Sequence, residues 1–156
     1  VGEKGIPMAM DAANKLNVKL KIVGEKAGLQ WENSEIEKRM SKNIEFLGRL
    51  DDDERNELYV TCKAFIVLEK DVDFGMTPVE AMAAGTSVVA YASGGYLETV
   101  IEGKTGTFFT EYNVTSLVDA MKRISKMKIK KEDCVAQAAK FSKENFVKKI
   151  TELVYA

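Results

Sequence analysis

The residues best suited to chemistry lie in the stretch DVDFGMTPVEAMAAG, residues 71–85. Gly75 allows the backbone to approach a ligand closely, and Pro78 presets the first turn of a helix. The first backbone N–H groups of such a helix have no partner within it and are expected to face an anion or a hydroxyl. Those groups belong to Met76, Thr77 and Val79. Glu80 lies in the same turn, where a carboxylate suits paired hydroxyls such as a ribose diol.

Lys4 offers a second contact for an anion, because it stands in a glycine-flanked loop, GEKG (residues 2–5), just before a helical pattern. A third loop, GEK at 24–26, follows a strand-like segment. Taken alone, Lys4 also fits an ordinary surface lysine, and Glu80 fits a charge that complements a helix dipole. Neither G-x-G-x-x-G nor G-x-x-x-x-G-K-[ST] is present, so the local residues predict a phosphate or nucleotide cleft of unspecified class.

Composition narrows the chemistry further. The 156 residues include no histidine, which excludes histidine general acid–base catalysis and Ser-His or Cys-His nucleophiles within this chain. The formal net charge of -1 gives no bulk attraction to nucleic acid or to an anionic membrane. Cys62 and Cys134 lack metal-ligand spacing. We expect them to be reduced, packed thiols, as in a cytoplasmic protein.

The elements that must position these residues alternate along the chain. Strand-like segments occupy 18–23, 43–47, 64–68, 87–91 and 106–109. Helical patterns occupy 6–16, 33–40, 53–62, 77–84, 96–101, 116–127, 132–140 and 142–155. This alternation predicts one α/β domain over 1–156, with a Rossmann-like parallel sheet flanked by helices. We also expect a mobile loop at 25–35 and a helical tail at about 142–155.

The start of the chain is unusual for such a fold, because a loop leads directly into helix 6–16. The first strand of a doubly wound sheet is usually central, and a domain without it would expose its core. We therefore expect either that residues upstream of Val1 belong to the fold or that the sequence is a fragment of a longer chain.

A longer stretch, DFGMTPVEAMAAGTSVVAYASGGYLETVIEGKTGTFF (residues 73–109), resembles the signature region of retaining GT-B glycosyltransferases. The family pattern reads loosely E-x-F-G-x-x-x-x-E-A-M-A-x-G-x-P-V-V-A, followed by G-G, an E, and G-x-T-G. Upstream, residues 3–5 resemble the P-E-K-G loop of the family. The nearest branch is that of the mannosyltransferases, and the likeness covers nearly the whole chain.

The resemblance implies a role for each candidate residue. Lys4 would bind the diphosphate of a nucleotide-sugar donor, and Glu80 would bind the ribose. The backbone at Gly75, Met76 and Thr77 would contact the sugar and diphosphate, and the loop at Gly48 and Arg49 would meet the nucleobase. The donor would be GDP-mannose or a UDP-sugar, and the acceptor a glycan or a lipid-linked saccharide. Transfer would retain the anomeric configuration without a bound metal or other cofactor.

Three departures from the pattern matter. The leading acid of the family falls on Val72, although a loop shift would let Asp71 or Asp73 substitute, and we take Asp73 with Glu80 as the catalytic candidates. The family's diphosphate-binding Arg is not in the sequence. An acceptor domain, the other half of the GT-B architecture, is expected upstream. The enzyme would be cytoplasmic or at the inner face of the membrane, with at most peripheral membrane contact.

Two other readings stay open: a non-catalytic nucleotide-sugar-binding or docking module, and a sugar-nucleotide epimerase of the same fold. The first is favoured by Val72. The second needs catalytic acids that the sequence does not reveal.

Overall fold

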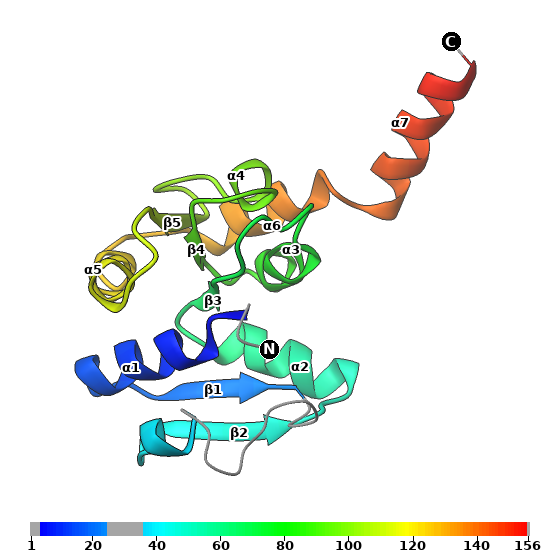
Figure 1. The fold of residues 1–156 in the computed structure, drawn as a ribbon. Helices are drawn as coiled ribbons and strands as arrows, with labels where there is room; N and C mark the ends of the chain where they lie inside the picture. The colour runs from blue at the N-terminus through cyan, green and yellow to red at the C-terminus, as the bar shows by residue number, and fades with distance from the viewer. Residues whose placement is uncertain (1–3, 25–35, 156) are drawn as a thin grey trace.

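The computed structural model describes residues 4–24 and 36–155, and Figure 1 shows their arrangement. The strands are β1 (Leu20–Val23), β2 (Ile44–Gly48), β3 (Phe65–Val67), β4 (Val88–Tyr91) and β5 (Gly106–Phe109). The helices are α1 (Ile6–Leu16), the 3-10 turn η2 (Glu37–Arg39), α2 (Asp52–Thr61), α3 (Met76–Ala83), α4 (Tyr96–Thr99), α5 (Val114–Ile124), α6 (Lys131–Ala139) and α7 (Lys143–Tyr155). The expected α/β architecture is confirmed, with parallel strands flanked by helices.

The described strands form two parallel sheets. β1 pairs with β2, and β3, β4 and β5 form the second sheet in that order. Among the described strands, β1 and β3 each have a partner on one edge alone. No described strand joins β1 to β3.

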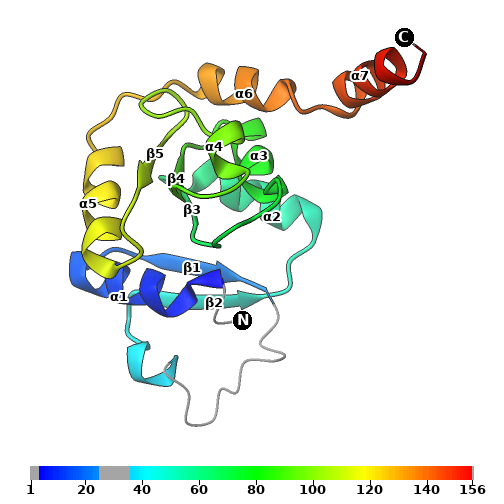
Figure 2. The same cartoon turned by 45° about the horizontal axis from the view of Figure 1, so that its top comes forward.

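Helix α1 packs against both sheets. Ala9 and Ala12 pack into the apolar cluster of Val89 and Leu117, whereas Met10 and Ala13 pack into a second cluster around Ile44. The first cluster also brings α1 against α5, as Figure 2 shows. Pro7 lies in the first turn of α1, where the sequence places it. The small residues of α1 let it pack closely, and this fixes the position of the loop that carries Lys4.

The predicted segments mostly match the observed elements within two residues at their ends. The exceptions are informative. Of the predicted helix 33–40, the described part forms only the 3-10 turn η2, and the backbone at Met40 is extended. Residues 33–35 and the predicted mobile loop 25–35 lie outside the described residues. In α2 the buried side chain is Tyr59, whereas Cys62 is exposed, so the prediction of two packed thiols holds for Cys134 alone.

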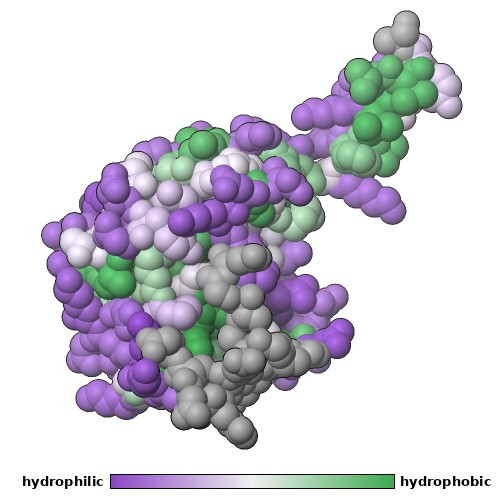
Figure 3. Space-filling view, viewed as in Figure 1, coloured by the Kyte–Doolittle hydropathy of each residue, from purple (hydrophilic) through white to green (hydrophobic). Residues whose placement is uncertain are grey.

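The tail helix α7 projects away from the two sheets (Figures 1 and 2). It begins as predicted, with the N–H of Asn145 donating to Ser142 Oγ at 3.3 Å. No residue of α7 is buried. Its apolar side chains form an exposed hydrophobic patch, visible in Figure 3: Phe146, Val147, Ile150, Leu153 and Val154. None of the described helices is both long and apolar enough to cross a membrane.

Candidate functional site

The start of α3 is open to a ligand. Gly75 precedes the helix with φ 77, and no side chain caps the first N–H groups. Met76 and Thr77 are exposed, whereas Pro78 is buried. A helix N-terminus left uncapped by the protein presents N–H donors and the positive end of the helix dipole. The predicted role of residues 75–77 in contacting a ligand stays a prediction.

Gly75 lies directly on the ring of Tyr96, the first residue of α4. A Cβ atom at position 75 would lie 2.6 Å from Cε1 of that ring. The glycine therefore serves two purposes: it allows the positive φ and it allows the close approach to Tyr96. The start of α3 is thus held by a fully buried aromatic side chain.

Lys4 is linked to the start of α3 by Glu69, an acid that the sequence analysis did not identify. Its Nζ lies 3.0 Å from Glu69 Oε1. Tyr96 Oη donates a hydrogen bond of 3.2 Å to the other oxygen, Glu69 Oε2. Burial, together with the charge of Glu69, raises the pKa of Tyr96, so the phenol stays protonated and remains a donor. The structure therefore brings Lys4 and Gly75 together around Glu69 and Tyr96.

One signal could have revealed Glu69: it directly follows the strand-like segment 64–68, at the carboxyl end of β3. Ligands of open α/β sheets bind beyond those ends. Tyr96 carried no comparable signal, because nothing near it in the sequence marks it as a partner of Glu69.

The Gly94-Gly95 pair packs closely against the backbone of residues 72–74. The N–H of Gly95 donates to the carbonyl of Val72 at 2.8 Å. A Cβ at position 95 would lie 2.5 Å from Cα of Phe74. These close approaches hold the 72–74 backbone against the start of α4, and therefore fix the loop between Glu69 and Gly75.

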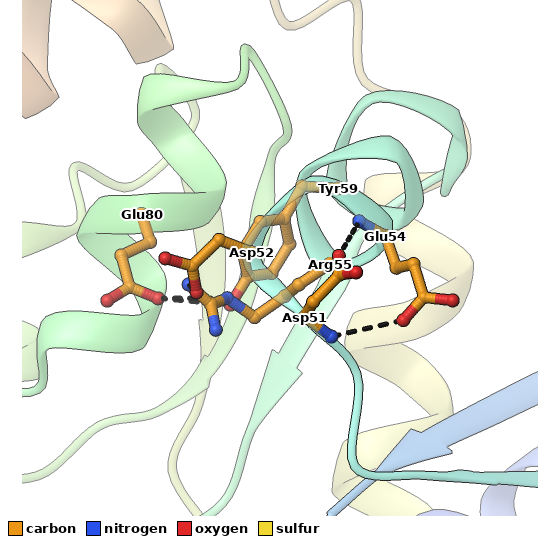
Figure 4. A network of polar contacts seen from close by, with 6 residues as sticks. All are labelled: Asp51, Asp52, Glu54, Arg55, Tyr59 and Glu80. Carbon is orange, nitrogen blue, oxygen red and sulfur yellow. Dashed lines mark hydrogen bonds and ion pairs between the residues drawn. The ribbon is translucent and has the colours of Figure 1, made fainter.

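Glu80 belongs to a separate polar network, shown in Figure 4. Tyr59 Oη donates to Glu80 Oε2 at 3.4 Å, and Arg55 Nε lies 3.9 Å from the same oxygen. The Arg55 guanidinium also meets Asp52 Oδ1 at 2.9 Å. Burial raises the pKa of Tyr59 to about 12, with a further contribution from the charge of Glu80. The side chain of Glu80 is 40% exposed, so its carboxylate is both oriented by the protein and accessible to a ligand.

Helix α2 positions this network through its two ends. At the start, Asp51 and Glu54 form a capping box, with hydrogen bonds of 2.9 and 3.0 Å. Near the end, Thr86 Oγ1 donates to the carbonyl of Tyr59. Both ends of α2 are therefore fixed, and Arg55 and Tyr59 are directed at α3.

The remaining candidates are placed as follows. The side chain of Val72 packs against the buried cluster of Val67 and Tyr96, so position 72 contributes to the core. Asp73 is exposed. The N–H of Asp71 donates to Ser93 Oγ at 3.0 Å, and Asp71 has φ 53.

The predicted nucleobase loop follows β2. Gly48 ends that strand with φ 71, and its carbonyl accepts a 2.8 Å hydrogen bond from the N–H of Gly24. Arg49 comes next and leads toward α2, whose Arg55 contacts Glu80. Within the described residues there is no cluster of three or more His, Cys, Asp or Glu side chains that could hold a metal ion.

Comparison with solved structures defines the class of fold. Sucrose-phosphate synthase from Thermosynechococcus elongatus superposes with a TM-score of 0.85 at 22% identity, covering 99% of this chain and 42% of that one. An Anabaena protein solved in complex with UDP-glucose superposes with a TM-score of 0.82 at 24% identity, covering 99% of this chain and 46% of that one. The chain therefore has the Rossmann-like fold of GT-B glycosyltransferases.

Sequence comparison defines the family. Residues 1–141 match the family described as glycosyl transferases group 1, and this chain belongs to that family. It is 32% identical over 118 residues to an uncharacterized glycosyltransferase of Methanocaldococcus jannaschii, covering 75% of this chain and 33% of that protein. It is 37% identical over 68 residues to a lipopolysaccharide core biosynthesis mannosyltransferase of Rhizobium leguminosarum bv. viciae, covering 44% of this chain and 19% of that protein. The chain thus spans a third or less of the length of these relatives.

Proposed function

We propose that this chain is the donor-binding, C-terminal half of a retaining GT-B glycosyltransferase. It would transfer a hexose from a nucleotide diphosphate sugar to a glycan or lipid-linked acceptor. The main support is the joining of Lys4 to the uncapped start of α3 through Glu69 and Tyr96. This arrangement gathers one cation and several N–H donors where a diphosphate would leave.

In this proposal the protein stabilises the departing diphosphate. Lys4 and the N–H groups of Met76 and Thr77 would oppose the negative charge that develops on the leaving oxygen as the glycosidic bond breaks. The acceptor hydroxyl would attack from the side on which the diphosphate departs, and that diphosphate would take the hydroxyl proton. Such a step needs no histidine and no bound metal, because the leaving group acts as base.

Glu80 would bind the ribose in this proposal. One of its oxygens is oriented by Tyr59 and Arg55, while the side chain remains partly exposed. A carboxylate accepts two hydrogen bonds from adjacent hydroxyls, as a ribose diol offers. Gly48 and Arg49, just ahead of α2, would meet the nucleobase.

The donor that we favour is GDP-mannose, with a UDP-sugar as the other choice. Mannose is supported by the likeness to the Rhizobium mannosyltransferase, and also by 37% identity over 67 residues to an alpha-1,3/1,6-mannosyltransferase of Dictyostelium discoideum. UDP-glucose is supported by the complex of the Anabaena protein.

We place the reaction in the cytoplasm, or at the inner face of the membrane with peripheral contact if the acceptor is lipid-linked.

An acceptor domain would complete the enzyme. Two features support such a partner: the exposed apolar face of α7, and the edges of β1 and β3 that no described strand pairs. Exposed apolar surface of this kind commonly marks an interface. Without that domain the chain should bind a donor weakly and transfer nothing.

Calorimetric titration with UDP, GDP, ADP and their sugars tests the donor site. We expect one nucleotide class to bind and Glu80→Ala to weaken it by about tenfold, the loss of roughly one hydrogen-bonded charged contact. Glu57→Ala, at an exposed acid of α2, is the matched control. If none of the nucleotides binds, or if both variants bind like the wild type, the assignment fails.

A non-catalytic nucleotide-sugar-binding module is the second candidate, because Val72 places an apolar side chain in the core where the family pattern has an acid. Transfer assays on a chain that includes the acceptor domain separate the two. Binding without transfer or donor hydrolysis would favour the module.

A further inference from the structure

Glu69 has no role in the proposed reaction, yet both of its oxygens are engaged. Oε2 accepts from Tyr96, whose side chain is fully buried, and Oε1 meets Lys4. The two partners of Glu69 differ in how firmly the protein holds them. Tyr96 is fixed by the core and by Gly75, whereas the side chain of Lys4 is 66% exposed. Glu69 is therefore the anchored partner of the ion pair, and Lys4 is the one that can move.

A diphosphate at Lys4 must share the lysine with Glu69. A phosphate oxygen that binds Nζ lies about 3 Å from it. With Oε1 of Glu69 also 3.0 Å from Nζ, the phosphate and the carboxylate come within roughly 6 Å of each other. At that distance two negative charges repel one another appreciably, since the side chain of Glu69 is only 33% exposed.

This repulsion depends on the charge of the ligand. The diphosphate of a nucleotide sugar is a diester, so each phosphate carries one charge. A free nucleoside diphosphate ends in a monoester with a second ionisation near pH 6, so it carries about one additional charge at neutral pH. The additional charge sits on the terminal phosphate, the one nearest the sugar position.

We propose that Glu69 is a specificity-determining residue, which makes the site hold a nucleotide sugar in preference to the free nucleoside diphosphate. The inference rests on the proposed donor site. With no ligand bound, Glu69 neutralises Lys4. After transfer, the same carboxylate disfavours the product and promotes its release. Substrate and product are thus distinguished by charge rather than by shape.

The test compares dissociation constants at pH 7.5 for two pairs of probes, UDP with UDP-glucose and GDP with GDP-mannose. In Glu69→Gln we expect free diphosphate to bind about tenfold more tightly and the sugar diphosphate about threefold more tightly, as a partly screened repulsion at this distance implies. The preference for the sugar nucleotide therefore falls about threefold. Glu69→Asp, which keeps the charge, should retain most of the preference.

Two further variants complete the design. Asp119→Asn on α5 removes the same charge from an exposed acid away from Lys4 and should change neither affinity. Tyr96→Phe keeps the ring on Gly75 but removes the anchoring hydroxyl, and the preference should fall part of the way toward that of Glu69→Gln. Circular dichroism checks that each variant is folded.

The outcomes separate this inference from the proposed function. If the wild type binds nucleotides and Lys4→Ala weakens them, but Glu69→Gln keeps the wild-type preference within twofold, the role of Glu69 is refuted and the donor site stands. If the wild type binds no nucleotide, or Lys4→Ala has no effect, the donor site itself is refuted, and the inference with it.

Discussion

Two buried tyrosines determine how the acids near α3 are held. Tyr59 donates to Glu80, and Tyr96 donates to Glu69. In each pair the phenol is buried and the carboxylate is partly exposed. A buried phenol with a raised pKa is a donor that does not ionise at physiological pH. Each acid is therefore oriented by the core while its charge still faces solvent and ligand.

Stability at high pH should report the environment of Tyr59. Its folded pKa of about 12 lies above the ordinary value of 10.0, so the folded protein keeps a proton that the unfolded chain loses. The contribution is complete below pH 10 and is lost as pH rises toward 12, by about 3 kcal/mol in total. Urea denaturation at pH 8.5 to 11.5 should show a shallower loss in Tyr59→Phe than in the wild type. Equal slopes would contradict the burial of this phenol.

A second prediction concerns Gly75. Gly75→Ala and Gly103→Ala both place a side chain at a positive φ, 77 and 73. The added Cβ at Gly75 meets the ring of Tyr96, whereas at Gly103 nothing lies within 4 Å. Both should lose roughly 1–2 kcal/mol for the backbone, and Gly75→Ala about 1–3 kcal/mol more for the clash. Denaturant midpoints measure the difference, and equal losses would mean that Gly75 and Tyr96 are not in contact.

At the scale of elements, α2 is what carries Arg55 and Tyr59 to Glu80. Asp51→Ala removes its cap and should cost about 1 kcal/mol of unfolding free energy. Asn113→Ala removes the equivalent cap of α5, where Asn113 Oδ1 accepts from the N–H of Ser116 at 2.9 Å. Stability should fall similarly in both, but nucleotide affinity should fall in Asp51→Ala alone. If both variants changed nucleotide affinity equally, α2 would have no specific role in positioning the site.

Elements could be predicted where one physical signal dominated. The apolar strands, the proline in the first turn of α1 and the Ser142 cap each have a local cause, and the structure agrees. Segment 33–40 failed because its periodic apolar residues, Ile36 and Met40, are joined by a short 3-10 turn instead of a helix. The prediction that Cys62 is packed failed for another reason. Tyr59 is the buried residue of α2, where it packs on Phe65 of β3 and accepts a hydrogen bond from Thr86, and these contacts form only when α2 packs beside β3 and α3.

The candidate site followed the same division. Gly75, Met76 and Thr77 were accessible to sequence reasoning because a glycine and a proline mark a helix start. The place of Glu69 just after β3 could be seen in the sequence, but its contact with Tyr96 could not, because that contact depends on how β3 and α4 pack. The position of Val72 in the core likewise depends on contacts that only the fold creates.

At the scale of the whole molecule, α7 differs from the other helices of eight or more residues that the structure describes, because none of its residues is buried. The double substitution Ile150→Glu and Leu153→Glu should therefore change the unfolding free energy by no more than about 0.5 kcal/mol. Leu117→Ala, at a fully buried residue of α5, should cost about 2–5 kcal/mol in the same measurement. A large loss in the α7 variant would show that this helix packs on the sheets.

The central claim is that a nucleotide sugar binds beside Lys4 and the start of α3. Its most direct test is two-dimensional amide NMR of the isotope-labelled chain during titration with UDP-glucose and with GDP-mannose. With one of the two, we predict saturable shifts at Lys4, Met76, Thr77 and Glu80, and unchanged amides in α5. Shifts confined to α5, α6 or α7, or no shift with either donor, would contradict it.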